Sequence, residues 1–315
     1  MIIFGFVIGS ILGSFAKALA DRSLSNRSFF GRSSCVNCKH KLNWYDLVPL
    51  ISYILLRGKC RYCSQKIPLE YLLVELGMGI LVALLFYKTF SSSSFLISNS
   101  PAIGVWQSLL NRFSSSFGMT DIALVFNLVL STFFITILAA VTITDFKKTL
   151  IPDRIMIPSI KIALSALTLF TIYKISYLYS YLNQTQIGKL LLPPHSDYFT
   201  RHAIYSAETL IYGVLTGLLI AGFFMGLIII TKGKGMGGGD VKLGGFMGLV
   251  LGFPNGILAV ILGFITGAII ALGLILLGKK KFGENIPFGP FLVTGSLIAL
   301  FWGNEIISWY LNLSR

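Results

Sequence analysis

Residues 122–143 read IALVFNLVLSTFFITILAAVTI and contain no charged side chain. An apolar run of about twenty residues is long enough to cross the hydrocarbon core of a bilayer as a helix. Comparable runs occur at residues 2–20, 72–87, 157–179, 209–230, 257–277 and 288–301, with a shorter one at 243–251. The sequence therefore predicts an all-α polytopic membrane protein with about eight transmembrane helices, one of them short.

The composition agrees with a membrane protein and excludes the soluble classes. Hydrophobic residues make up 55% of the chain and charged residues 12%, whereas a soluble domain carries charge on about a quarter of its residues. The apolar content also excludes a disordered or collagen-like chain. Four cysteines in 315 residues are too few for a disulfide scaffold.

The basic residues predict the orientation in the membrane. The chain carries 26 Lys and Arg against 12 Asp and Glu, a net charge of +14. In a soluble protein this excess would favour a nucleic-acid partner, but in a membrane protein basic residues gather in cytoplasmic loops beside anionic lipid. Alternating the predicted spans places 20 of the 26 basic residues on one face. That face holds the connections 21–71, 144–156, 231–242 and 278–287.

We therefore expect that face to be cytoplasmic, with the N-terminus outside. The protein should be a multi-pass protein of the cell (inner) membrane that contacts lipid and binds no nucleic acid. Two long connections on the opposite face, residues 91–120 and 181–206, are expected to be surface loops.

All four cysteines lie between the first two predicted spans, in the pairs Cys35-Val-Asn-Cys38 and Cys60-Arg-Tyr-Cys63. Two such pairs can close a tetrahedral thiolate site around zinc, and a site with four protein ligands is structural. A disulfide is disfavoured because the cytosol keeps thiols reduced. Redox-active or unligated cysteines are the alternatives. We expect a membrane anchor at residues 1–20, a small cytoplasmic zinc-knuckle domain at 21–71 and a transmembrane domain at 72–315.

Carboxylates are so rare in this chain that two of them stand out. Asp145 ends the third predicted span and Asp240 opens the short sixth one, so both meet the face expected to be cytoplasmic. Asp240 follows the run Gly235-Met-Gly-Gly-Gly239, whose backbone can approach a bound partner closely. A helix from Asp240 to the residue before Pro254 would span only about 20 Å, against about 30 Å of hydrocarbon. Asp240 should therefore lie recessed below the lipid surface.

Two close carboxylates in a poorly solvated site share one proton. One can take a proton from water while the other donates to a carbonyl oxygen. Asp145 and Asp240 are therefore candidates for the catalytic pair of an aspartic peptidase that cleaves at the membrane boundary.

Other interpretations of these carboxylates remain open at this point. Asp240 could simply cap its helix, and Asp145 could neutralise Lys147 or Lys148. Asp153 also begins a predicted span and competes with Asp145. A transporter or channel that uses Asp145 and Asp240 as cation ligands, or a zinc-holding scaffold without chemistry, would fit the same residues.

Several motifs, taken in order, resemble the type IV prepilin peptidase family, also called prepilin leader peptidase/N-methyltransferase. The resemblance covers nearly the whole chain apart from the two long connections. It rests on Gly13-Ser14-Phe15, both cysteine pairs, Trp44-Tyr-Asp46-Leu-Val-Pro-Leu-Ile-Ser52, Arg57-Gly-Lys-Cys60, Lys66-Ile67, Tyr71-Leu-Leu-Val-Glu75, Asp145 with Leu150-Ile-Pro-Asp153, Asp240-Val-Lys-Leu243 and Ile286-Pro-Phe-Gly-Pro-Phe291.

The resemblance implies that Asp145 and Asp240, rather than Asp153, form the catalytic dyad. It implies prepilin and pseudopilin substrates, whose basic leader is cut on the cytoplasmic side, and hence a role in type IV pilus assembly or protein secretion. Many members then methylate the new N-terminus with S-adenosylmethionine, using the domain that bears the cysteines. Peptidase activity without methylation is the alternative, because the chain has no glycine-rich nucleotide loop after a strand.

The four cysteines distinguish this chain from other peptidases with the same type of dyad, and one stretch departs from the usual sequence of the family. Preflagellin peptidases and signal-peptide-peptidase relatives share the G-x-G-D type of dyad but lack the four cysteines. After Gly13-Ser14-Phe15 the family usually reads Leu-Asn-Val-Val, whereas this chain reads Ala16-Lys17-Ala18-Leu19.

Overall fold

The structure, a computed structural model, describes residues 1–29, 31–35, 37–92, 119–233, 236–279 and 287–313. The described residues form helices and contain no strand, only two isolated β-bridges, Ser34 with Lys41 and Lys59 with Lys66. Within these described residues, seven helices are long and apolar enough to cross a membrane. They are α1 (Ile2–Leu24), α3 (Leu69–Ser92), α5 (Met119–Lys148), α6 (Asp153–Asn183), α8 (Tyr198–Ile230), α10 (Asn255–Leu276) and α11 (Gly289–Leu313).

Four short helices complete the described structure: the 3-10 helix η1 (Trp44–Leu47), α2 (Ile51–Leu55), α7 (Gln186–Leu190) and α9 (Gly238–Leu251). The last of these, α9, is the short sixth span of the prediction. Its 14 residues extend about 21 Å at 1.5 Å per residue. The predicted fold class, an all-α polytopic membrane protein with a small cysteine segment between its first two spans, is confirmed.

The expected loop at residues 181–206 is wrong for most of its length. Helix α6 runs to Asn183, α7 occupies Gln186–Leu190 and α8 begins at Tyr198. The polar and aromatic residues of this stretch lower its hydropathy, but no Gly or Pro occurs between residues 159 and 187 to end the helix. The other expected loop, 91–120, falls almost wholly outside the described residues.

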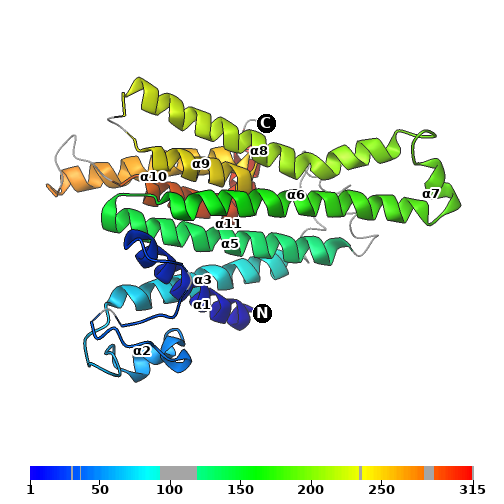
Figure 1. Cartoon of the computed structure of the whole chain (residues 1–315). Helices are drawn as coiled ribbons and strands as arrows, with labels where there is room; N and C mark the ends of the chain where they lie inside the picture. Colours follow the sequence, from blue (N-terminus) through cyan, green and yellow to red (C-terminus); the bar gives the residue numbers. More distant parts are fainter. Residues whose placement is uncertain (30, 36, 93–118, 234–235, 280–286, 314–315) are drawn as a thin grey trace. The chain divides into compact units, whose positions relative to one another are not determined.

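The chain divides into two compact units, each described here by itself. The first comprises residues 1–155 and 305–315. In it α1 packs along α3, and both contact α5 (Figure 1). Gly5, Gly9 and Gly13 recur every fourth residue on α1 and face α3, an arrangement that lets membrane helices approach closely.

The α1–α3 contact gives a direct stability prediction. A methyl group at Gly9 would lie 2.9 Å from the Gly79 Cα atom and still closer to the Met78 carbonyl oxygen. We expect Gly9→Ala to destabilise the protein by about 1–3 kcal/mol, because the backbones must move apart. The matched control is Gly77→Ala on α3, where an added methyl group meets nothing within 4 Å. Thermal unfolding in detergent checks this; equal stability of the two variants would contradict it.

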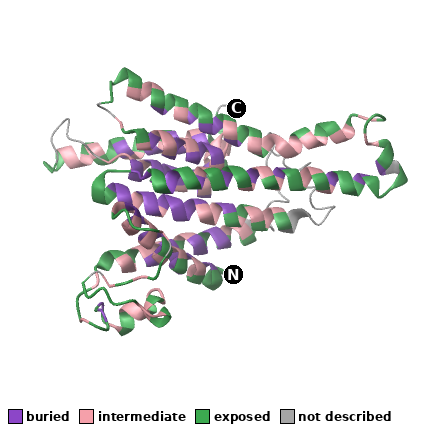
Figure 2. Cartoon of the chain, viewed as in Figure 1, coloured by how far each residue is buried: buried purple, intermediate pink, exposed green. Residues whose placement is uncertain are grey.

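The second unit comprises residues 156–304. In it α9 packs against α8 and α10, and Figure 2 shows α9 as largely buried. A Cβ atom at Gly248 of α9 would lie 2.6 Å from the Gly217 Cα atom of α8, so these two helices touch backbone to backbone. This packing encloses the short helix that begins just before Asp240.

Candidate functional site

The four cysteines come together in the cysteine-bearing segment, residues 25–68 of the first unit. In each pair the backbone carbonyl of the first cysteine accepts a hydrogen bond from the backbone N–H four residues on, that of Lys39 or Ser64. Both of these residues have positive φ. The backbone N–H of the same cysteine donates to the carbonyl five residues on. The two pairs are therefore two copies of one backbone turn, each closed by an isolated bridge.

The geometry of the four thiols fits a metal ion. All four sulfur atoms lie within 4.8 Å of one another, and the Sγ atoms of Cys35 and Cys63 are 3.8 Å apart. A tetrahedral site with Zn–S bonds of about 2.3 Å places neighbouring sulfurs about 3.8 Å apart, whereas a disulfide needs about 2.05 Å. The cysteines are free thiols, and together they could hold one metal ion.

Hydrogen bonding makes one thiol easier to ionise than another. The backbone N–H of Gln65 and the neighbouring thiols lower the pKa of Cys63 to about 7. The pKa of Cys38 is raised to about 11, because desolvation and hydrogen bonds with Cys35 and Cys63 outweigh the lowering effect of the His40 backbone. The cluster therefore contains a thiol that reaches the metal-binding thiolate form near neutral pH.

Asp46 ties the segment between the cysteine pairs to the second pair, a role that the sequence analysis did not assign. Its side chain is 3% exposed, and it accepts hydrogen bonds from Arg61 Nε at 2.8 Å and from the Tyr62 hydroxyl at 3.2 Å. The Arg61 guanidinium also lies 4.9 Å from the centre of the Tyr45 ring. These contacts make η1 and the second cysteine pair one packed body.

Asp145 and Asp240 are both buried, at 5% and 9% exposure, whereas Asp153 is exposed at the start of α6. Asp145 lies in the last turn of α5, in the first unit. Asp240 lies in the first turn of α9, in the second unit. Burial thus distinguishes Asp145 and Asp240 from Asp153. That Asp145 and Asp240 act as a catalytic pair stays a prediction.

The structure bears on the capping interpretation of Asp240. Its Oδ2 atom accepts a hydrogen bond from the Gly237 backbone N–H at 3.3 Å, so the side chain does help to begin α9. Capping does not need burial, because an N-terminal residue caps a helix equally well in water. A carboxylate that is both capping and 9% exposed remains a functional candidate.

A charged network joins α1, α3 and α5, and its α5 member, Lys147, lies two residues after Asp145. Lys17, only 1% exposed, pairs with Glu70 at 2.9 Å and Asp21 at 3.4 Å. Lys147 pairs with the same two carboxylates, at 3.1 and 3.0 Å. The charge of Lys147 is therefore balanced by Asp21 and Glu70. Sequence reasoning missed this network, although the departure from the family pattern at Lys17 was its signal.

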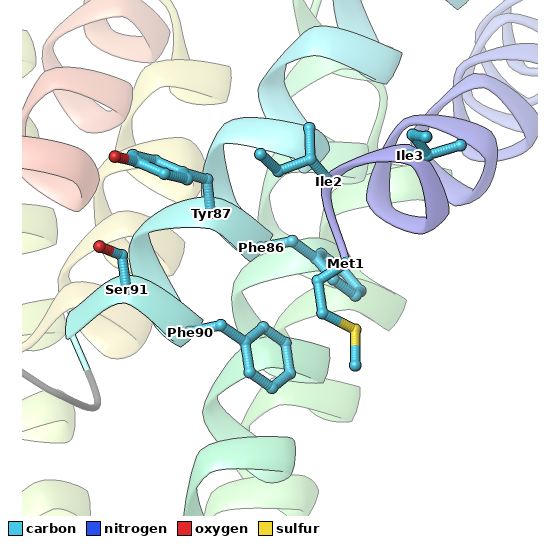
Figure 3. Close-up of a pocket in the computed structure, with 7 residues that line it drawn as sticks. All are labelled: Met1, Ile2, Ile3, Phe86, Tyr87, Phe90 and Ser91. Atoms are coloured by element: carbon cyan, nitrogen blue, oxygen red, sulfur yellow. The ribbon is translucent and has the colours of Figure 1, made fainter.

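An open apolar hollow of about 630 Å³ lies where the first turn of α1 meets the last turns of α3 (Figure 3). Its lining is Met1, Ile2, Ile3, Phe86, Tyr87, Phe90 and Ser91. It occupies the end of these helices opposite to Lys17 and Glu70. The residues that line the hollow include no carboxylate.

These features define a multi-pass helical membrane protein with a four-cysteine site. Two family models match the chain: the Bacterial Peptidase A24 N-terminal domain over residues 7–89, and the Type IV leader peptidase family over residues 132–272. The chain belongs to the type IV leader peptidase family, so the resemblance noted in the sequence is confirmed. The first match contains all four cysteines, and the second contains Asp145 and Asp240.

Several curated relatives are named prepilin leader peptidase/N-methyltransferase. The one from Bacillus subtilis is 27% identical over 310 residues, covering 98% of this chain and 97% of the relative. The one from Aeromonas hydrophila is 28% identical over 89% of this chain and 75% of the relative. The one from Vibrio cholerae is 36% identical over 35% of this chain and 46% of the relative. No solved structure matches the chain.

Proposed function

We propose that this protein cleaves the basic leader from prepilins and pseudopilins and then methylates the new N-terminal residue. The observation that carries the proposal is that the Type IV leader peptidase match, residues 132–272, contains the two buried aspartates. The names of the relatives support both activities. The activity places the protein in type IV pilus assembly or in a related secretion system.

Asp145 and Asp240 are the proposed catalytic dyad. One carboxylate takes a proton from the attacking water, and the other, protonated, donates to the scissile carbonyl oxygen. The resulting tetrahedral intermediate collapses when the leaving amine receives the proton first taken from water. Because a carboxylate pair in a poorly solvated site holds one proton between its members, the resting pair has one acid and one base ready.

The orientation is part of the proposal. The excess of basic residues on the face that holds residues 21–71 and 144–156 supports a cytoplasmic site in the inner membrane, with the N-terminus outside. We assign residues 1–20 to the anchor, 21–71 to the cysteine domain and 72–315 to the peptidase domain.

Zinc is the proposed occupant of Cys35, Cys38, Cys60 and Cys63. Four thiolates satisfy its tetrahedral preference and leave no position for water, so the ion would hold the segment together. The cysteine domain is the proposed place of methyl transfer, for which S-adenosylmethionine supplies the methyl group when bound.

One incubation tests both activities. Membranes that contain the protein are incubated with a prepilin and isotopically labelled S-adenosylmethionine, and the product N-terminus is analysed by mass spectrometry. We expect a shortened chain with one labelled methyl group. Cleaved but unmethylated product would refute methyl transfer alone, and uncut prepilin would refute the proposed function.

A further inference from the structure

A strained turn lies midway between the two cysteine pairs. Leu50 has φ +61° and ψ −51°, and the Ile51 N–H donates to the Pro49 carbonyl across it at 2.6 Å. This is a γ-turn with positive φ at a leucine, a conformation that non-glycine residues rarely adopt. Such backbone persists only where surrounding contacts impose it, and it gathers at functional positions.

The contact that imposes the turn comes from a membrane helix. The Leu50 N–H donates to Glu75 Oε2 of α3 at 2.9 Å. Glu75 is 8% exposed within an apolar helix, where a carboxylate is costly unless it is hydrogen-bonded. On α1, Gly13 packs directly against the Glu75 backbone. Glu75 thus joins α1, α3 and the cysteine-bearing segment at one point.

The cysteine-bearing segment behaves as a unit at this point. On one side of Leu50, Asp46 binds Arg61 of the second cysteine pair. On the other side, the Tyr53 hydroxyl donates to the Ile67 carbonyl at 3.3 Å. Because both flanks of the turn are tied to the rest of the segment, the bond to Glu75 links the whole segment to α3.

We propose that Glu75 is a positioning residue for methyl transfer, acting through the Leu50 N–H to hold the cysteine-bearing segment in place against α1 and α3. The inference rests on the proposed function, because it needs the methyl-transfer step that the cysteine domain is proposed to perform. Cleavage depends instead on Asp145 and Asp240, on α5 and α9. Loss of the bond to Glu75 should therefore separate the two activities.

The test compares substitutions that remove or keep the hydrogen-bond acceptor. Glu75→Leu keeps the approximate size but leaves the Leu50 N–H without an acceptor, whereas Glu75→Gln keeps a carbonyl oxygen. Leu50→Gly keeps the N–H and adopts positive φ without strain. The matched control is Glu305→Gln on α11, an exposed carboxylate that pairs with Lys88. Each variant is assayed for cleavage, for methylation, for zinc content and for hydrogen exchange at residues 48–56.

We expect Glu75→Leu to lose about 100-fold in methylation rate, the effect of displacing a reacting group by about 1 Å. Its cleavage rate and zinc content should stay at the wild-type level, while hydrogen exchange at residues 48–56 increases. Glu75→Gln, Leu50→Gly and Glu305→Gln should methylate like the wild type.

Three results would overturn the inference. They are wild-type methylation by Glu75→Leu, an equal loss of cleavage and methylation in that variant, and unchanged hydrogen exchange. If the wild type itself cleaves but does not methylate, the methyltransferase half of the proposed function fails together with this inference. If the wild type methylates and Glu75→Leu does too, only the inference fails.

Discussion

Asp240→Asn and Asp145→Asn are each expected to lower the rate of prepilin cleavage by about 10³-fold or more, the scale of loss when a general acid or base is removed. An amide can neither take a proton from water nor donate the carboxylic proton to the substrate carbonyl. Asparagine keeps the volume of aspartate, so both variants should fold and insert as the wild type does.

The Asn substitution at position 240 also separates catalysis from capping. Its amide oxygen can still accept the hydrogen bond from the Gly237 N–H that Asp240 accepts. If Asp240 only began α9, Asp240→Asn would cleave at nearly the wild-type rate.

The matched control is Asp153→Asn, because Asp153 is exposed and follows Asp145 closely in the sequence. It should cleave like the wild type. The measurement is the initial rate of leader removal in membranes with equal amounts of each variant. Loss of activity in Asp153→Asn with activity kept in Asp145→Asn would contradict the assignment of the dyad.

Cys60→Ser is expected to remove the bound metal and the methylation activity together. Cys60 is the most buried of the four cysteines, at 7% exposure, and a serine hydroxyl does not ionise to replace a thiolate. Binding of structural zinc contributes about 10–16 kcal/mol to the folding of small zinc domains. Loss of one ligand should therefore release the ion and loosen both cysteine turns.

The matched control for the metal site is His40→Gln. His40 follows Cys38 closely in sequence, but its ring lies against that of Tyr62, with the ring centres 3.8 Å apart, and is not part of the cysteine cluster. Elemental analysis should find about one zinc ion per chain in the wild type and in His40→Gln, and none in Cys60→Ser. A metal-free wild type would contradict the zinc assignment.

The fold could be predicted from the sequence because each membrane helix is encoded by a continuous apolar run of about twenty residues. Each predicted span became a helix, since backbone groups in lipid must be bonded within the segment. The ends of the helices were less predictable. Helix α6 continues past its apolar run to Asn183, and α8 begins well before its own run, at Tyr198. Hydropathy reports the lipid boundary and not the end of a helix.

The candidate site was predictable only where the signal is local. The spacing of Cys35, Cys38, Cys60 and Cys63 predicted a cluster that the structure contains. The ion pair between Lys17 and Glu70 joins residues on different helices, and no local sequence pattern predicts such a contact. Glu75 had a local signal, an acidic residue inside an apolar span, but its partner Leu50 is known only from the folded chain.

The most direct test of the dyad is the mass of a prepilin after incubation with purified protein in liposomes. The comparison is between the wild type and the double variant Asp145→Asn, Asp240→Asn. We predict that the wild type releases the leader and yields the mature N-terminus, while the double variant returns the prepilin uncut. Normal processing by the double variant, or no processing by the wild type, would contradict the account.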